Sequence, residues 1–291
     1  MLSRLGTKIF FCRSMWSEHR FISFDKTPIF FRRLSVKNPS KGLVVIVHGM
    51  GEHSGRYREF AEFLGENGYC CYLPDLRGFG QSGGKRGCVK RFTDYFFDLD
   101  GVRRLMHTWE SHNRAFYFGH SYGGLITTHY LLERPALQAR GLILSSPNFG
   151  ISVEVPFWRT ALARVAAYLA PDMTQSNRVD RTKLTHDVEH LRKHAADRLI
   201  HDRISAGLYV QLLAGIEAVD KAAPQIKVPA LVLQAGEDYI VDTRATQRVF
   251  NALGSPDKKF KEFEGMYHEI LNETSRQAVY QLITAWLGQH T

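Results

Sequence analysis

A serine lies at the centre of a glycine-rich pentapeptide, Gly119-His120-Ser121-Tyr122-Gly123. The apolar run 115–118 before it is typical of a strand, and the segment 125–133 after it is typical of a helix. A strand that turns this tightly into a helix needs glycines beside the serine and holds the serine in a strained conformation with its hydroxyl exposed. The pattern therefore predicts a nucleophile elbow. A glycine-rich turn with a capping serine is the alternative.

A serine hydroxyl becomes a nucleophile at neutral pH only with a base, and with a carboxylate that holds the base in one tautomer. In a sheet of this order the acid and then the histidine follow the serine along the chain. The expected acid is Asp238, just after the strand-like run 231–234. Glu237 and Asp242 are its rivals, and Asp242 is better suited to cap the helix that follows.

Thirteen histidines compete for the role of base. We expect His268, because it follows the run 260–263 and a turn, on a loop where a histidine has no packing role. His120 adjoins the serine but points away from it, so we expect it to pack behind the elbow. His48 ends a strand, and we expect it to hydrogen-bond to a neighbouring loop.

Acyl transfer also needs donors for the oxyanion of the tetrahedral intermediate, each worth about 2.7–4 kcal/mol of barrier. The first expected donor is the backbone N–H of Tyr122, directly after the serine. The second is the backbone N–H of Met50, in the segment His48-Gly49-Met50-Gly51 that ends the β-branched run 43–48. The glycines on either side let the chain approach a substrate.

Two other groups of polar residues are of the types found in phosphate-binding or metal-binding sites, but the surrounding sequence does not fit such a site. Asp75 and Arg77 lie in a glycine-rich loop without the Gly-Lys-Ser/Thr of a phosphate-binding loop, so we expect them to brace it. His186, His190 and His194 are spaced to share one helix face, yet three residues over two turns converge poorly on one ion. We expect a solvated face there, with no metal and no cofactor.

The segments that must position these residues alternate between strand and helix. Residues 21–24 and 29–34 predict an opening hairpin. Further strand-like runs lie at 43–48, 69–73, 115–118, 141–145 and 230–234, with helical stretches at 60–66, 95–110 and 125–133. This alternation predicts an α/β fold with a mostly parallel sheet, an antiparallel beginning and helices on both faces.

The alternation stops after Pro147. From residue 151 to about residue 223 no strand pattern appears, and apolar residues recur at helical spacing. We therefore predict an all-helical insertion into a single core. The predicted organisation is a core over residues 1–150, a helical cap over 151–223 and the second part of the core over 224–291.

Two apolar stripes mark the helices of this insertion. They are Val155, Trp158, Leu162, Val165 and Leu169, and then Ile204, Leu208, Leu212, Ile216 and Val219. Such stripes usually bury a cap against its neighbours, which is the interpretation we favour. Peripheral contact with a membrane through Phe157 and Trp158 is compatible with it.

Composition narrows the class of protein. With 291 residues, 44% of them hydrophobic and 23% charged, the chain can bury one large core. Its net charge of +9 is dispersed and no recognition motif accompanies it, so we expect no nucleic acid and favour attraction to anionic lipid. The cysteines, which are Cys12, Cys70, Cys71 and Cys88, have no metal or disulfide spacing and predict reduced thiols. Neither an export signal nor a membrane span is evident, so we expect a cytoplasmic protein.

Longer motifs carry a resemblance to a known family. H-G-M-G-E-H-S-G-R-Y at 48–57, D-L-R-G-F-G-Q-S at 75–82 and G-H-S-Y-G-G at 119–124 resemble α/β-hydrolases, most closely the monoacylglycerol lipase and lysophospholipase group. The similarity continues at 197–209, 231–238 and 265–269 and covers most of the chain from about residue 21.

The resemblance implies an eight-stranded α/β-hydrolase sheet and a helical cap over an apolar acyl tunnel. It also implies the triad of Ser121, Asp238 and His268, with Met50 and Tyr122 as oxyanion donors. Family members commonly carry methionine at the position of Tyr122, so the larger side chain is expected to narrow the acyl pocket.

We therefore expect a serine esterase that hydrolyses carboxylic esters of single-chain lipids, monoacylglycerols first, through an acyl-enzyme. Lysophospholipids or small soluble esters are alternative substrates. A peptidase that removes N-terminal proline is disfavoured, because no acidic pair in the cap stands out to bind an amine. The non-enzyme alternative is a membrane-docking protein of this fold that binds a ligand without turnover. The sequence leaves acyl length, head group and oligomeric state open.

Overall fold

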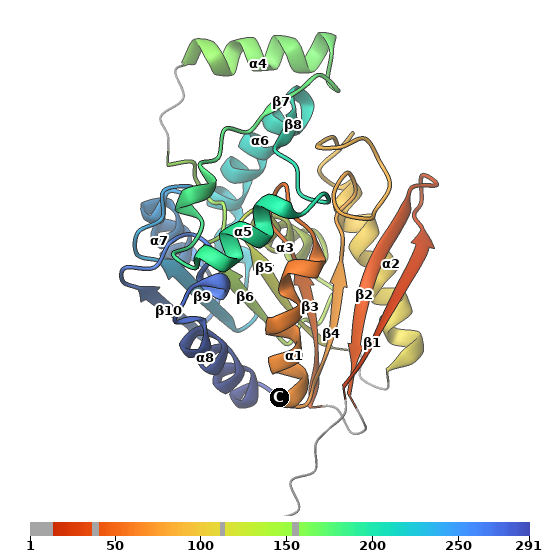
Figure 1. Cartoon of the computed structure of the whole chain (residues 1–291), viewed down its shortest axis with the longest axis vertical. Coiled ribbons are helices and arrows are strands. Elements are labelled where there is room, and N and C mark those ends of the chain that lie inside the picture. Colours follow the sequence, from red (N-terminus) through yellow and green to blue (C-terminus); the bar gives the residue numbers. More distant parts are fainter. Residues whose placement is uncertain (1–13, 37–40, 111–113, 153–156) are drawn as a thin grey trace, which may run out of the picture.

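The computed structural model describes residues 14–36, 41–110, 114–152 and 157–291 (Figure 1). The predictions made for Cys12, for Val155 and for the first thirteen residues lie outside the described residues.

Eight strands form one sheet in the order β1-β2-β4-β3-β5-β6-β9-β10. They are β1 (Met15–Ile22), β2 (Pro28–Ser35), β3 (Gly42–Val47), β4 (Tyr69–Pro74), β5 (Ala115–His120), β6 (Gly141–Ser145), β9 (Ala230–Ala235) and β10 (Lys258–Phe263). β2 pairs antiparallel with β1 and β4, whereas the other pairings are parallel. The mostly parallel sheet with an antiparallel beginning is confirmed. The opening hairpin starts earlier than predicted, because β1 begins at Met15.

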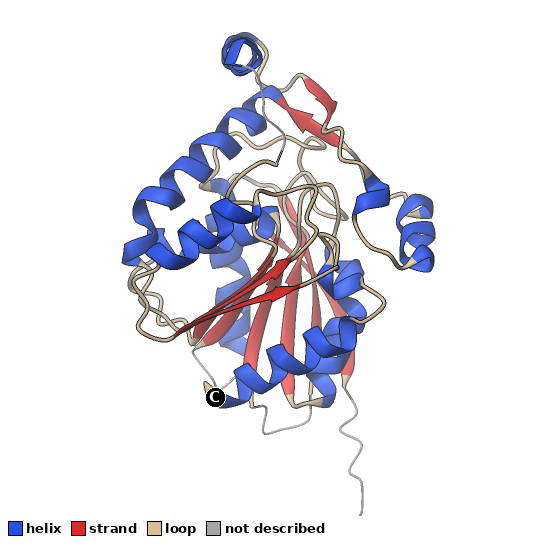
Figure 2. Ribbon diagram, turned by 90° about the vertical axis from the view of Figure 1, so that its left-hand side faces the viewer, coloured by secondary structure: helices blue, strands red, loops and turns tan. Residues whose placement is uncertain are grey.

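Successive residues of the central strands enter two separate cores. In β3, Val45 belongs to one core and Val44 to the other, and Cys70 and Cys71 of β4 are divided in the same way. Helices α1 (Arg58–Glu66) and α8 (Arg276–Gln289) cover one face, and α2 (Asp94–Trp109), α3 (Tyr122–Glu133) and α7 (Thr243–Ala252) cover the other (Figure 2). Burial of each aliphatic side chain stabilises the fold by about 1.5–3 kcal/mol. The central strands are therefore apolar throughout rather than alternating.

The chain leaves the sheet between β6 and β9. This insertion contains α4 (Phe157–Leu169), β7 (Thr174–Ser176), η2 (Arg181–Lys183), α5 (Val188–Ala196), β8 (Arg203–Ser205), α6 (Ala206–Ala222) and η3 (Ala223–Gln225). The prediction of an all-helical insertion was wrong, because β7 and β8 pair antiparallel. Strands of three residues are too short to produce a period-two pattern in the sequence. The limits at residues 150 and 223 stay a prediction.

The insertion lies over the carboxyl ends of the parallel strands (Figure 1). The backbone N–H of His201 donates to the carbonyl of Gly51, in the loop after β3, over 3.0 Å. In the reverse direction, the N–H of Glu269, in the loop after β10, donates to the carbonyl of Leu184 over 2.8 Å. Loops at the carboxyl ends of two strands are thereby joined to the insertion, and these are the loops that carry predicted site residues.

The two apolar stripes of the insertion differ in burial. In the second stripe Leu208 and Val219 are fully buried, as predicted. In the first stripe the described side chains Trp158, Leu162, Val165 and Leu169 are 52–74% exposed, so burial against neighbours was the wrong prediction for α4. Helical spacing marks a face that avoids water but does not say what covers it. None of the helices in the described ranges is long and apolar enough to cross a membrane.

Candidate active site

Ser121 links β5 to α3 in a backbone conformation that non-glycine residues rarely adopt. Its φ is 52° and its ψ is −119°. The backbone N–H donates to the carbonyl of Ser145 in β6 over 3.0 Å, which holds the turn against the neighbouring strand. A side chain at Gly123 would collide with the carbonyl oxygens of Val47 and His48, so the helix can start this close to β3 only with glycine there. The local geometry is that of the predicted elbow.

Asp238 and His268 are brought together by the last two strands. Asp238 follows β9 and His268 follows β10, and these strands are parallel neighbours, so both loops lie at the same edge of the sheet. Asp238 Oδ2 lies 2.8 Å from His268 Nδ1. Asp238 Oδ1 accepts the backbone N–H groups of Ile240 and Val241 over 2.9 and 3.0 Å. The carboxylate is thus fixed on one side by main chain and faces the imidazole with the other.

The rivals of Asp238 lie elsewhere. The Glu237 side chain is exposed. Asp242 caps α7 by accepting the N–H of Arg244 over 2.9 Å, as expected of it. Asp238 is the carboxylate in contact with His268.

The environment of the pair keeps it poised for proton transfer. Burial lowers the pKa of His268, but the charge of Asp238 and its hydrogen bond outweigh burial and raise that pKa above its ordinary value. Burial raises the pKa of Asp238, but His268 and the two backbone donors outweigh it, so this carboxyl stays ionised. An ionised aspartate on Nδ1 leaves Nε2 as the nitrogen that can accept a proton.

The other two histidines near the serine have structural roles. The His120 ring lies behind the elbow, with Nδ1 3.0 Å from the carbonyl of Ser145, and burial together with His268 lowers its pKa to about 4. Its ring centroid is 4.8 Å from that of His268, which places His268 beside the elbow. His48 Nε2 accepts the N–H of Leu76 over 2.9 Å, so the predicted bond to a neighbouring loop is confirmed.

The two segments that carry the expected oxyanion donors lie next to Ser121. Tyr122 is the first residue of α3, so its N–H has no carbonyl partner within the helix. Met50 lies in the turn after β3, next to Gly49, where an added Cβ would lie 3.3 Å from Ser121 Cβ. The Tyr122 side chain is fully buried, with its ring edge-on to the rings of Phe92 and Tyr95.

A buried ion cluster that the sequence reasoning missed connects two of these loops. Arg56 donates to Glu52 over 2.6 Å and to both carboxylate oxygens of Glu269 over 2.6 Å. Glu52 also accepts the N–H of Gly49 over 2.6 Å. Burial raises the pKa of both carboxyls, but the guanidinium outweighs it and holds both below their ordinary values. Arg56 therefore ties the turn that carries Met50 to the residue after His268.

We call Glu52, Arg56 and Glu269 the Arg56 clamp. Its members lie inside two of the motifs that resemble the hydrolase family, H-G-M-G-E-H-S-G-R-Y and G-M-Y-H-E. The sequence shows that these residues are charged. It does not show that they pair, because Arg56 and Glu269 are more than two hundred positions apart. Only their position inside these motifs could have pointed to these residues, and the motifs did not indicate what the residues do.

Asp75 and Arg77 brace the loop after β4, as predicted. Asp75 accepts the backbone N–H groups of Ser54 and Gln81 over 2.8 and 2.7 Å. Arg77 makes two 2.7 Å hydrogen bonds to Asp98 of α2. Each charge is thus engaged in holding the loop.

The three spaced histidines do not converge. His186 precedes α5 and lies 2.9 Å from Glu273 Oε1, while His190 lies 3.1 Å from Asp187. His190 and His194 both line a cavity of about 260 Å³ beside His53, and His186 does not. Across the described ranges no three His, Cys, Asp or Glu side chains are arranged to hold a metal ion.

Comparison with known proteins gives independent evidence about the family of this chain. The serine aminopeptidase S33 family matches residues 38–275. Phospholipase YtpA of Bacillus subtilis is 30% identical over 249 residues, which are 85% of this chain and 95% of YtpA. Monoglyceride lipase of Homo sapiens is 30% identical over 278 residues, which are 93% of this chain and 90% of that protein.

A solved structure agrees with this relationship. The crystal structure of Paleococcus ferrophilus monoacylglycerol lipase has a TM-score of 0.82 and 32% identity, and the match covers 95% of this chain and 100% of that one. Its match extends over both the sheet and the insertion. The chain therefore belongs to the serine aminopeptidase S33 family of α/β-hydrolases.

Proposed function

We propose that this protein is a serine hydrolase that cleaves carboxylic esters of single-chain lipids, with monoacylglycerols as the first candidate. The observation that carries the proposal is the buried Asp238–His268 pair beside a serine held at a positive φ. Ser121 attacks the ester carbonyl while His268 takes its proton through Nε2, and Asp238 stabilises the imidazolium that forms. The N–H groups of Tyr122 and Met50 bind the oxyanion.

The second half of the reaction reuses the same groups. His268 returns its proton to the departing alcohol, which leaves Ser121 acylated. His268 then takes a proton from water, whose oxygen attacks the acyl carbonyl. It passes this proton to Ser121 Oγ as the bond between the serine and the acyl group breaks, which releases the fatty acid and restores the enzyme. No cofactor takes part in either half.

Relatives support this choice of substrate. A monoglyceride lipase and a monoacylglycerol lipase are 30% and 32% identical to this chain. A lysophospholipid is the second candidate, because YtpA, named a phospholipase, is equally similar. Aminopeptidase activity is disfavoured, since Glu52 and Glu269 of the site are both engaged by Arg56 and are not free to bind an amine.

Replacement of Ser121 by alanine tests the proposal. We expect hydrolysis of a chromogenic short-acyl ester to fall to background, and labelling by a fluorophosphonate to disappear. Retained hydrolysis, or failure of the folded wild type to label, would contradict it and favour the non-catalytic alternative. Rates with monoacylglycerols and lysophosphatidylcholines of matched acyl length then decide the head group.

The exposed face of α4 supports peripheral contact with a membrane as part of this function. Leu162, Val165, Tyr168 and Leu169 are each more than half exposed, and α4 lies at the outer edge of the insertion (Figure 1). A helix with such a face can lie in the interface of a bilayer. We further place the enzyme in a reducing, cytoplasmic environment, because Cys71 and Cys88 are buried thiols that form no disulfide with a described residue.

Vesicle binding tests the membrane contact. We expect the double variant Leu162→Ser and Leu169→Ser to lose most of its co-sedimentation with anionic vesicles and to keep its rate on a soluble ester. Val188→Ser is the matched control, because Val188 is 77% exposed but belongs to α5. Equal loss of binding in both proteins, or in neither, would exclude α4 as the contact.

A further inference from the structure

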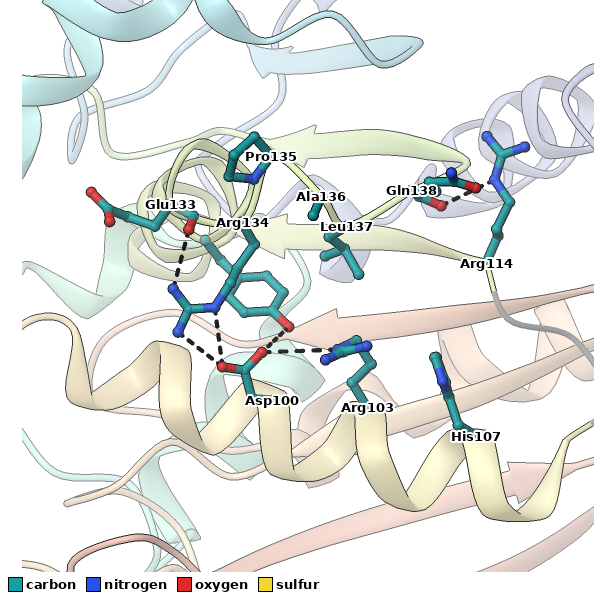
Figure 3. Close-up of a pocket in the computed structure, with 11 residues that line it drawn as sticks. Asp100, Arg103, His107, Arg114, Glu133, Arg134, Pro135, Ala136, Leu137 and Gln138 are labelled. Carbon is teal, nitrogen blue, oxygen red and sulfur yellow. Dashed lines mark hydrogen bonds and ion pairs between the residues drawn. The ribbon is translucent and has the colours of Figure 1, made fainter.

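A second cavity lies at the opposite end of the sheet from Ser121. It has a volume of about 410 Å³, within the range of small-molecule sites, and is lined by α2, the end of α3 and the segment before β6 (Figure 3). Arg114, which precedes β5, also lines it. Ser121 follows the other end of β5, and a strand of this length spans about 20 Å. The cavity is therefore separate from the proposed active site.

Cationic side chains dominate the polar lining of this cavity. Asp100 and Glu133 are the acidic residues in its lining, and the charge of Asp100 is already matched by Arg134. Asp100 Oδ2 accepts two hydrogen bonds from Arg134 over 3.1 and 2.9 Å, and Oδ1 accepts the Tyr130 hydroxyl over 2.9 Å. The carboxylate of Glu133, which also lines the cavity, is turned away from Arg103 (Figure 3). Two further arginines remain.

Arg103 lacks the hydrogen bond that its position requires. Its Nε is buried and has no hydrogen-bond acceptor among the described residues; its ion-pair partner, Asp100 Oδ1, is 3.8 Å away, beyond hydrogen-bond distance. A buried donor without an acceptor costs about 1–3 kcal/mol. The side chain as a whole is 33% exposed and lines the cavity, so the guanidinium is within reach of an anion bound there.

Arg114 brings a second cation to the same cavity. Its Nε and Nη2 donate to the main-chain carbonyls of Gln138 and Ala139 over 3.0 and 3.4 Å, and these groups carry no formal charge. Within the described ranges no carboxylate lies within ion-pair distance of Arg114. The carbonyls hold the guanidinium in place without neutralising it. Pro135, Ala136 and Leu137 form an apolar part of the lining between Arg134 and Arg114 (Figure 3).

We propose that this cavity binds a small organic anion, a carboxylate or a phosphate monoester with a short apolar portion. The anionic group accepts hydrogen bonds from Arg103 and lies in the field of Arg114, and the apolar portion packs on Leu137. The site is independent of the ester-hydrolysis proposal, because none of its residues takes part in that reaction.

Calorimetric titration of the full chain tests this site, with hexanoate, butyl phosphate and 1-hexanol as probes in a low-salt buffer free of other carboxylates and phosphates. The Ser121→Ala variant is used, so that esterase activity has no bearing on the result. We expect saturable 1:1 binding of an anion and none of 1-hexanol. The tighter of the two anions identifies the head group. Absence of binding by both anions, or equal binding of the alcohol, would overturn the proposal.

Matched variants on α2 locate the bound anion. We expect Arg103→Gln to weaken binding at least about tenfold, the loss of one charge-assisted hydrogen bond. Arg104→Gln is the control, because Arg104 is the exposed neighbour on the same helix and does not line the cavity, and we expect its affinity to change less than about twofold. If Arg103→Gln lowers the melting temperature of the free protein, Arg114→Gln serves in its place. Equal effects of the Arg103 and Arg104 variants, or no effect of Arg114→Gln, would contradict the site.

Discussion

Replacement of Asp238 by asparagine is the sharpest test of the proposed triad, because the structure dictates how the new amide must lie. Asp238 Oδ1 accepts two backbone N–H groups, from Ile240 and Val241, while Oδ2 faces His268 Nδ1 and the Gln234 amide at 2.8 and 3.1 Å. An asparagine oxygen can occupy only one of these two positions.

The two orientations of the amide differ in cost. With its oxygen toward His268, its NH₂ group would face the N–H groups of Ile240 and Val241 and leave both without an acceptor. Each such buried donor costs about 1–3 kcal/mol. With its oxygen toward the backbone, the NH₂ group donates to His268 Nδ1, and only the Gln234 bond is lost; Gln234 keeps its bond to the carbonyl of Ala235. The second orientation is therefore favoured.

That orientation forces the imidazole into the tautomer that does not work. With Nδ1 as acceptor, Nε2 carries the proton and cannot take one from Ser121. A wrong tautomer in a serine triad lowers turnover about ten-thousand-fold, which corresponds to about 5 kcal/mol of barrier. We expect a loss in kcat/KM of that order on a soluble ester, with the unfolding midpoint changed little.

The rival carboxylates provide the controls. Glu237→Gln changes an exposed side chain and is expected to leave kcat/KM within about twofold. Asp242→Asn keeps a residue that can cap α7, so its activity should also be retained. Activity of Asp238→Asn within tenfold of the wild type, or a large loss in Glu237→Gln, would refute the assignment of the acid.

Three more predictions concern other parts of the site. Because Asp238 raises the pKa of His268 and the reaction needs the neutral imidazole, activity should fall as pH decreases through a midpoint above 6.5; a midpoint below it in kcat/KM profiles would contradict the predicted environment. Glu269 also raises the pKa of His268, so Glu269→Gln should move the midpoint to lower pH. The variant should also reduce kcat by about tenfold or more, because Arg56 loses one of its two carboxylate partners. An unshifted pH profile would mean that the Arg56 clamp has a purely structural role. Gly123→Ala should destabilise the fold by about 3 kcal/mol or more in urea titrations. Gly288→Ala is the control: its added methyl meets no atom within 4 Å, so it should be neutral or stabilising by up to about 1 kcal/mol. Similar effects of the two substitutions would contradict the close contact at the elbow.

Most of the fold could be predicted from local patterns. The runs 43–48, 69–73 and 141–145 are continuous and apolar, and each became a strand buried on both faces. The hairpin and the helices near 60–66, 95–110 and 125–133 were recognisable for the same reason, because periodicity and turn residues act over a few positions. The strands β7 and β8 were not predicted, because three residues are too few to show the alternation typical of a strand.

The sequence by itself determined where a serine had to leave a strand and enter a helix, because only glycine tolerates the contact that Gly123 makes with β3. It also limited the acid to three neighbouring carboxylates. The parallel pairing of β9 and β10 decided which of the three contacts His268. The side chains of neighbouring loop residues point in different directions, and no sequence pattern shows which one points toward the histidine.

Tertiary structure alone decided the rest. Arg56 and Glu269 are more than two hundred residues apart, and Asp100 of α2 hydrogen-bonds to Arg134, which follows α3, while Arg103 lies 3.8 Å from it. The exposure of α4 likewise depends on what packs against it. Local sequence fixes the chemistry and direction of a side chain along its own element, whereas its partners come from segments that only the folded chain brings within hydrogen-bond distance.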